Sequence, residues 1–161
     1  MEITFDKAAM VAFTGHRFFD FKRKAEIKAK LTAAVIECYN NGYTGFITGM
    51  AVGFDMMAAE VVLSLKTICP ELRLYAAIPF KGQPETFKEY NRLRYESILS
   101  RCTEIIVLSD VYYTRCYLDR DLFMINNCSM VIALYDGRRQ GGTWWTLSRA
   151  IDQGKRIINV Y

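Results

Sequence analysis

The sequence predicts an α/β fold: a single Rossmann-like domain whose mostly parallel six-stranded sheet carries helices on both faces. Short apolar runs such as 130–135 show no alternation of polar and apolar residues, which is typical of strands covered on both faces. These runs alternate strictly with helix-length segments, and that alternation favours parallel pairing through right-handed crossovers. With 161 residues and neither a repeat nor a linker, residues 1–161 are expected to form one domain.

Local signals mark the limits of the elements. Asn40-Asn41-Gly42 ends the first helix, Pro70 and Pro79 bracket the third strand, and Gly154 separates the last helix from the last strand. The predicted strands lie near 9–14, 44–48, 72–78, 104–108, 129–135 and 156–160. The predicted helices lie near 21–41, 53–68, 85–101, 117–127 and 143–153.

The predicted helix 53–68 differs from the others because it is apolar almost all round from Met56 to Leu65. A helix of this kind must be covered on more than one side. We therefore expect it to pack on the sheet and also against another helix or a second subunit. The second alternative makes a homo-oligomer one expectation for this chain.

Charge and composition limit the classes of partner. A formal net charge of +4 suits a phosphorylated ligand but is too weak and too evenly spread to indicate nucleic acid. Five cysteines without a CxxC pair and a single histidine predict no metal site and a reducing compartment. Without a signal-peptide pattern in 1–6 or a membrane-length apolar stretch, we expect no membrane association and a cytoplasmic location.

Three glycine-bearing loops, each between an apolar strand and a helix, are the main functional signal. They are Thr14-Gly15-His16-Arg17, the loop 48–55 (Thr-Gly-Met-Ala-Val-Gly-Phe-Asp), and Asp136-Gly137 followed by Gly141-Gly142-Thr143. Glycine lets the backbone approach a ligand closely, and a helix N-terminus offers unpaired N–H donors with a positive dipole end. Three such loops at one sheet edge predict an anion site, above all for phosphate, whereas a single loop could simply turn a corner.

Individual residues in and near these loops have two interpretations each. Arg17 could hold a phosphate or lie on the surface. Asp55 could bind ribose or act as a base, or its carboxylate could simply be stabilised by the dipole of its helix. His16 is more typical of a structural group. Arg120 could reach over the pocket or pair with a neighbouring aspartate. No catalytic residue is assigned. The candidate ligand-binding residues are Thr14, Gly15, His16, Arg17, Gly49, Met50, Gly53, Asp55, Arg120, Asp136, Gly141, Gly142 and Thr143.

Several of these segments resemble a known superfamily. The run 11–17 (Val-Ala-Phe-Thr-Gly-His-Arg), the loop 48–55 and Gly141-Gly142-Thr143 resemble the SLOG superfamily, which joins the DprA/Smf DNA-processing proteins with the LOG proteins. The run 119–124 (Asp-Arg-Asp-Leu-Phe-Met), followed by 131–137, is similar to its small stand-alone YpsA-like branch. The resemblance covers about 10–160. It implies a Rossmann-like fold and a pocket for a nucleotide or nucleotide-derived small molecule.

The resemblance also implies a reaction, because the LOG enzymes are phosphoribohydrolases that cleave the base from a nucleoside monophosphate. In their pattern a glycine-glycine-x-glycine-threonine turn is followed after two residues by a catalytic glutamate. Here Gly141-Gly142-Thr143 lacks one glycine, and Thr146 stands at the place of the glutamate. A threonine cannot act as acid or base in place of a carboxylate. The chain also has Asp121 where the YpsA-like branch usually has asparagine.

The sequence therefore leaves three candidate functions. The first is a cytoplasmic domain that binds a nucleotide-derived ligand, as a sensor or signalling component. The second is a LOG-like nucleoside-monophosphate phosphoribohydrolase, against which the missing glutamate counts. The third is a DprA-like accessory in DNA processing, for which the sequence shows no basic groove with interleaved aromatic residues.

Overall fold

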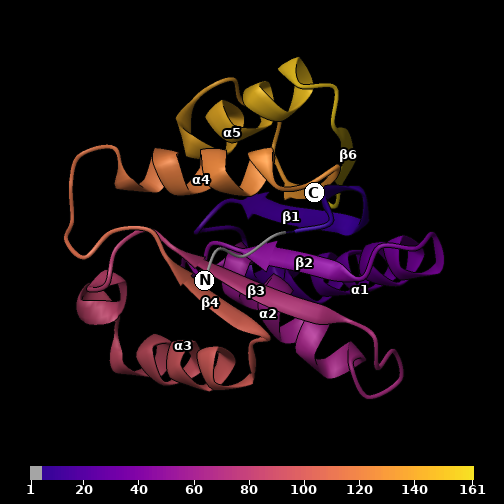
Figure 1. Ribbon diagram of the computed structural model, residues 1–161, viewed down its shortest axis with the longest axis horizontal. Helices are drawn as coiled ribbons and strands as arrows, with labels where there is room; N and C mark the ends of the chain where they lie inside the picture. Colours follow the sequence, from indigo (N-terminus) through magenta and orange to yellow (C-terminus); the bar gives the residue numbers. More distant parts are fainter. Residues whose placement is uncertain (1–4) are drawn as a thin grey trace.

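The computed structural model, which describes residues 5–161, pairs six parallel strands into one sheet (Figure 1). The strands are β1 (Met10–Gly15), β2 (Gly45–Thr48), β3 (Arg73–Ile78), β4 (Glu104–Val107), β5 (Met130–Leu134) and β6 (Arg156–Asn159). Their order across the sheet is β4-β3-β2-β1-β5-β6. The predicted α/β class is therefore confirmed, and the chain switches from one half of the sheet to the other between β1 and β5.

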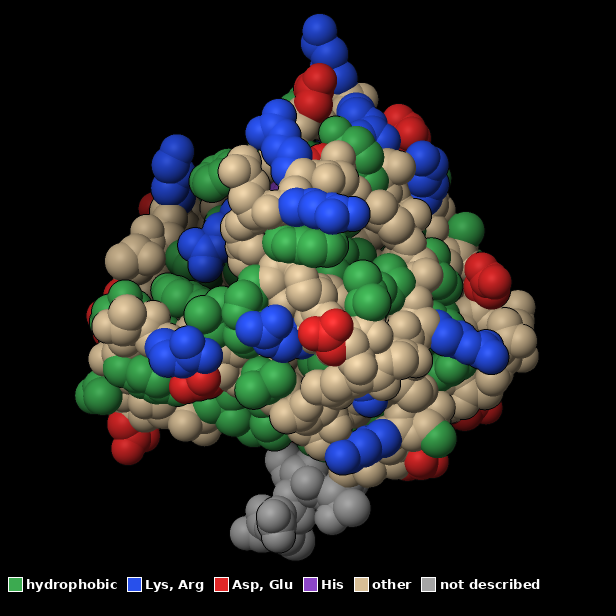
Figure 2. Space-filling view, turned by 90° about the horizontal axis from the view of Figure 1, so that it is seen from above, with side chains coloured by type: hydrophobic (Ala, Val, Ile, Leu, Met, Phe, Trp, Pro, Cys, Tyr) green, Lys and Arg blue, Asp and Glu red, His purple; other side chains and the backbone are tan. Residues whose placement is uncertain are grey.

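The helices divide into two layers (Figure 1). They are α1 (Lys24–Asn40), α2 (Phe54–Leu65), α3 (Glu89–Arg101), α4 (Cys116–Asn126) and α5 (Gly141–Asp152). The first three connect strands that progress outward from β1 to β4, and right-handed crossovers place them together on one face. The remaining two connect strands that progress in the opposite direction, so α4 and α5 cover the other face. Seen over α4 and α5, Lys and Arg side chains are spread among apolar and acidic ones (Figure 2).

Helix α2 shows how the apolar helix of the sequence is covered. Ten of its twelve residues are buried, and it packs on the sheet with α1 and α3 on either side. Met57 and Leu65, which could have faced a second subunit, are only 5% and 7% exposed. The cover is thus another helix on each side, as one of the two alternatives predicted. Self-association stays a prediction, but α2 no longer gives a reason for it.

Four of the predicted helices differ from the observed ones by one to three residues at their ends, and the fifth is divided. The segment 85–101 is divided into a short 3-10 turn, Gln83–Thr86, and α3, because Phe87 and Lys88 have extended backbone between them. Helix α5 begins at Gly141, two residues earlier than expected. Within 5–161 no helix is long and apolar enough to cross a membrane. Residues 1–4, on which most of the signal-peptide prediction rests, lie outside the described part of the chain.

Candidate functional site

The three glycine-bearing loops meet at the carboxyl ends of β1, β2 and β5, three adjacent strands. A cavity of about 270 Å³ opens there, at the switch between β1 and β5 where open α/β sheets bind ligands. Eight of the predicted residues line it, together with four that were not predicted. The predicted ones are Thr14, Gly15, His16, Arg17, Asp55, Arg120, Gly142 and Thr143.

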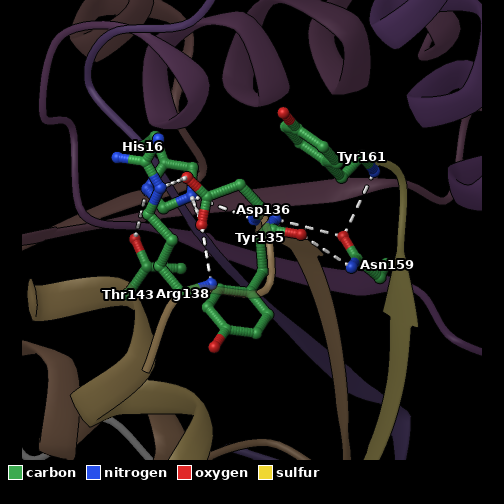
Figure 3. Close-up of polar contacts among 7 residues, drawn as sticks. All are labelled: His16, Tyr135, Asp136, Arg138, Thr143, Asn159 and Tyr161. Atoms are coloured by element: carbon green, nitrogen blue, oxygen red, sulfur yellow. Dashed lines mark hydrogen bonds and ion pairs between the residues drawn. The ribbon is translucent and has the colours of Figure 1, made fainter. Parts of the chain in front are cut away.

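His16 connects all three loops, and its contacts with the third loop are shown in Figure 3. Its carbonyl oxygen accepts a hydrogen bond from the Phe54 amide in the second loop, 3.2 Å away. Its ring reaches the third loop, where Nε2 accepts from the Asp136 amide at 3.1 Å and Nδ1 lies 3.4 Å from the Thr143 hydroxyl. In the neutral ring this arrangement leaves the proton on Nδ1, facing Thr143. His16 is therefore held as a structural tie between loops, with one ring edge at the cavity.

Asp136 and Gly141 lie on the other side of His16, in a more open hollow of about 400 Å³. The Asp136 carboxylate accepts from the Arg138 amide at 3.0 Å and lies 3.4 Å from His16 Nε2. The hydrogen bond from the Arg138 amide holds the pKa of Asp136 below its usual value, although partial burial acts in the opposite direction. These two predicted residues therefore shape the third loop but do not line the cavity itself.

The N-terminal end of α5 is open toward the cavity. Its N-cap residue, Gln140, makes no side-chain hydrogen bond to the helix within the described chain. The first N–H groups of a helix have no acceptor inside the helix, so those at Gly141, Gly142 and Thr143 are available to an anion. A Cβ atom added to Gly142 would meet no described heavy atom within 4 Å. Its packing does not require glycine, whereas close approach of a ligand would.

A buried polar cluster closes the opposite side of the cavity. The Arg120 side chain, only 4% exposed, donates from Nε to Asp121 Oδ1 at 2.7 Å and from Nη1 to the Gly49 carbonyl oxygen. Burial alone would lower the pKa of Arg120, but the carboxylates of Asp121 and Asp55 outweigh it and raise that pKa. The guanidinium is thus a fixed positive charge beneath the cavity. Of the two neighbouring aspartates, Asp119 and Asp121, it pairs with Asp121.

Asp55 is the most deeply buried carboxyl group of the site, with 7% of its surface exposed. Its Oδ2 accepts from the Ala51 amide at 3.4 Å. Burial raises its pKa to about 7, and the charge of Asp121 adds to that effect, while Arg120 opposes it. Asp55 can therefore hold or release a proton near neutral pH, which an exposed aspartate cannot do.

Three predicted residues serve the frame rather than the cavity. Gly53 has φ +86°, and a Cβ there would lie 2.2 Å from the Arg17 carbonyl oxygen, so only glycine fits beneath the first loop. A Cβ on Gly49 would lie 2.6 Å from the Arg120 guanidinium. Met50 is fully buried with φ 59°. None of the three lines the cavity, so their contact with a ligand stays a prediction.

The lining residues that the sequence did not identify are Ala51, Tyr117, Leu118 and Asp121. Tyr117 packs with Phe80 and Tyr112, and the guanidinium of Arg17 lies 5.2 Å from its ring centroid. The Asp121 Oδ2 atom lies 2.9 Å from the Thr146 hydroxyl, which also lies 2.9 Å from the Gly142 carbonyl oxygen. The departure at 121 was visible in the sequence, but its contact with Thr146 joins α4 to α5 and requires the fold.

Comparison with known proteins agrees with this architecture. The UPF0398 proteins of Bacillus thuringiensis (strain Al Hakam) and Bacillus cereus (strain AH187) are each 28% identical over 159 residues, covering 91% of this chain and 84% of the relative. The structure of DNA processing protein A from Helicobacter pylori matches with a TM-score of 0.60 and 18% identity, and the match covers 94% of this chain and 65% of that one. That structure concerns the single-stranded DNA binding mode of the Helicobacter pylori protein. The X-ray structure of TM1055 matches with TM-score 0.57 and 14% identity, over 92% and 71%.

The two structural matches are too distant in sequence to show more than a shared fold. The family model is more specific: the model of the YspA SLOG family (YpsA) matches residues 11–157. That range includes every strand-end loop of the cavity and all of α4 and α5. The chain therefore belongs to the YspA SLOG family.

Proposed function

We propose that the cavity binds a nucleotide or nucleotide-derived ligand through a phosphate group. The open N-terminal end of α5 carries this proposal, because it combines unpaired amides with a glycine that leaves space beside them. Arg17, at the cavity rim, adds a guanidinium that can meet a phosphate with two N–H groups. Tyr117 offers a ring for the rest of the ligand. The predicted role in sensing or signalling stays a prediction.

Ligand-dependent stabilisation tests this proposal. A ligand that binds only the folded state adds roughly 2.7 kcal/mol of stability at 100 times its Kd, which raises Tm by roughly 5–10 °C in a protein of this size. We expect such a rise with at least one member of a series of nucleoside monophosphates, dinucleotides and ADP-ribose. Gly142→Asp should abolish it, because the new carboxylate would repel the phosphate at the α5 terminus.

Thr67→Asp is the matched control for this variant. It makes the same change in charge at an exposed position outside the cavity, so it should retain the full rise in Tm. If Gly142→Asp also retained the full rise, the third loop would be a turn and not a phosphate site.

A specific observation favours a second candidate, hydrolysis of a nucleotide glycosidic bond. Two carboxyl groups of different character line the cavity: Asp121 beside a permanent cation, and Asp55 with a pKa of about 7. Asp121 contacts the hydroxyl of Thr146, so a neighbouring helix brings a carboxylate to the residue that stands in place of the LOG glutamate. An ionised Asp121 could stabilise positive charge on the ribose, while Asp55 could transfer a proton.

Release of free base from nucleoside monophosphates distinguishes the two candidates. If the protein is a hydrolase, Asp121→Asn should lower the rate by about 100-fold or more, since a positioned carboxyl group contributes that much. Asparagine retains an acceptor for Arg120 but not the carboxylate charge, so circular dichroism must show that the variant is folded before the rates are compared. Thr146→Val, which removes the hydroxyl contacts to Asp121 and to the Gly142 carbonyl oxygen but keeps the carboxylate, should have a smaller effect. If wild type releases no base with any nucleotide that stabilises it, the site is a binding site alone.

A further inference from the structure

The structure contains a second hollow, of about 350 Å³, beside the cavity proposed to bind a nucleotide (the nucleotide cavity). Its floor is the start of α2, with Gly53 and Met57, and its walls are the segment 17–28 and the start of α3. Arg17 lines both hollows, so they adjoin at the end of the first loop. We refer to this second hollow as the aromatic groove. It lies on the face covered by α1, α2 and α3, away from the face shown in Figure 2.

Three aromatic rings stand in solvent around the aromatic groove. Phe18 is 86% exposed, Phe21 80% and Tyr90 69%. They come from two segments far apart in the sequence, 17–28 and 90–94, yet all three line this one hollow. Rings that contribute nothing to the core and gather at one place mark a binding surface.

The charges around the aromatic groove are also unbalanced. Arg17, Lys24 and Lys28 line it and form no ion pair within residues 5–161, and the Lys24 ammonium lies 5.7 Å from the Phe21 ring centroid. The one carboxylate in its described lining, Glu60, is bound by Arg94, whose Nε lies 3.4 Å from Glu60 Oε2. Three cations beside these exposed rings are therefore left without a carboxylate partner in the described chain.

We infer that the aromatic groove binds single-stranded nucleic acid, with bases stacked on its rings and phosphates on its cations. Single strands are held by this combination, because every base has a π-face and every nucleotide a negative charge. A second copy of the chain fits less well. It would also carry a net charge of +4, and interface cores are depleted of unpaired charges.

The sequence predicted that nucleic acid was an unlikely partner, and this inference departs from that prediction for a physical reason. The groove draws on 17–28, 53–60 and 90–94, which only the packing of α1, α2 and α3 brings together. The segment 17–24 (Arg-Phe-Phe-Asp-Phe-Lys-Arg-Lys) does place rings beside cations, but only the fold adds the Tyr90 ring and shows that Phe18 and Phe21 are exposed. Only Arg17 is shared with the nucleotide cavity, so the rings and the two lysines carry the inference whatever occupies that cavity.

Fluorescence anisotropy with a labelled single-stranded oligothymidylate of about 12 nucleotides tests the inference. We expect binding to the wild-type chain that weakens with salt, with a slope of log K against log salt of roughly −2, as three phosphate contacts give for a single strand. Phe18→Leu with Phe21→Leu should weaken binding by roughly 5- to 150-fold for each ring that stacks a base. Leucine keeps the surface apolar, so this double variant separates stacking from general hydrophobic contact.

Matched controls accompany the charged residues. Lys24→Ala with Lys28→Ala should reduce the magnitude of the salt slope by roughly 1.4, the share of two phosphate contacts. Lys22→Ala with Lys66→Ala removes the same charge from exposed positions outside the groove and should change the slope little. Gly142→Asp, in the nucleotide cavity, should leave oligothymidylate binding unchanged, so failure here can be told from failure of the cavity proposal.

Three results would overturn the inference. One is the absence of salt-dependent binding by the wild-type chain. Another is binding that both the leucine and the Lys24/Lys28 variants retain, which would place the strand elsewhere. The third is concentration-dependent self-association that Phe18→Ala with Phe21→Ala abolishes while no oligonucleotide binds, which would show that a second copy covers the rings. Because both phenylalanines are exposed, these variants should keep the wild-type Tm.

Discussion

Replacing Arg120 with methionine is expected to lower the free energy of unfolding by about 3–5 kcal/mol, the usual cost of removing one partner of a buried ion pair. The side chain is 4% exposed and joins α4 to the loop after β2, through Asp121 and the Gly49 carbonyl oxygen. Methionine fills a similar volume but leaves that carbonyl oxygen with the Gln83 amide as its remaining donor, and it leaves Asp121 without its cation. Urea denaturation followed by circular dichroism measures the difference.

Two further variants make the Arg120 prediction specific. Arg115→Met removes an arginine that stands directly before α4 but is 62% exposed, so it should cost about 0–0.5 kcal/mol. Adding Asp121→Asn to Arg120→Met should recover part of the loss, because the uncompensated carboxylate disappears. Equal small losses in Arg120→Met and Arg115→Met would contradict the burial and pairing described for Arg120.

Much of the fold follows from local patterns, and the strand order does not. Apolar runs such as 130–135 and breaks such as Pro70 predict where strands lie, since both act through neighbouring residues. The position of β1 between β2 and β5 depends instead on which strands pair, which no local run encodes. Helix α2 lies between these cases: its apolar surface required a second cover, but only the fold identifies α1 and α3 as that cover.

The candidate site likewise has features that the sequence predicts and features that depend on the fold. The loops could be predicted because glycine between strand and helix is a local signal, and His16, Arg17 and Thr143 do meet at the cavity. Gly53 was expected at a ligand, yet it is glycine because the Arg17 carbonyl oxygen lies over it. Asp121 was seen only as a departure from the family pattern, since its contact with Thr146 spans 25 residues. Long-range contacts of this kind decide which polar residue stabilises the loops and which faces the cavity.

The second large effect expected is a loss of stability as pH rises from about 4 to 7, caused by Asp55. In the unfolded chain an aspartate has a pKa of 3.8, whereas burial raises the pKa of Asp55 to about 7 in the folded protein. Between these values the folded state holds a proton that the unfolded state has released, so each increase in pH favours unfolding. The shift corresponds to about 4 kcal/mol, reached by pH 7 and constant above it.

Comparison with the Asp55→Asn variant isolates this contribution, because other groups titrate in the same range. Asp136, whose pKa is lowered in the fold, has the opposite sign and stabilises the protein above its unfolded pKa. Asparagine retains an oxygen to accept from the Ala51 amide but has no proton to lose, so the difference between the two proteins removes the shared terms. The free energy of unfolding of each protein is measured by urea denaturation at successive pH values.

The difference between the two free energies of unfolding should shift in favour of the Asp55→Asn variant as pH rises from about 4 to about 7, and then stay level. The loss of stability caused by ionisation of residue 55 occurs in the wild-type chain and not in the variant, because asparagine cannot ionise. A difference that does not change between about pH 4 and 7 would mean that Asp55 ionises normally in the fold. That result would also remove Asp55 as the proton-transferring group of the hydrolase candidate, because a carboxyl group with an ordinary pKa holds no proton near neutral pH.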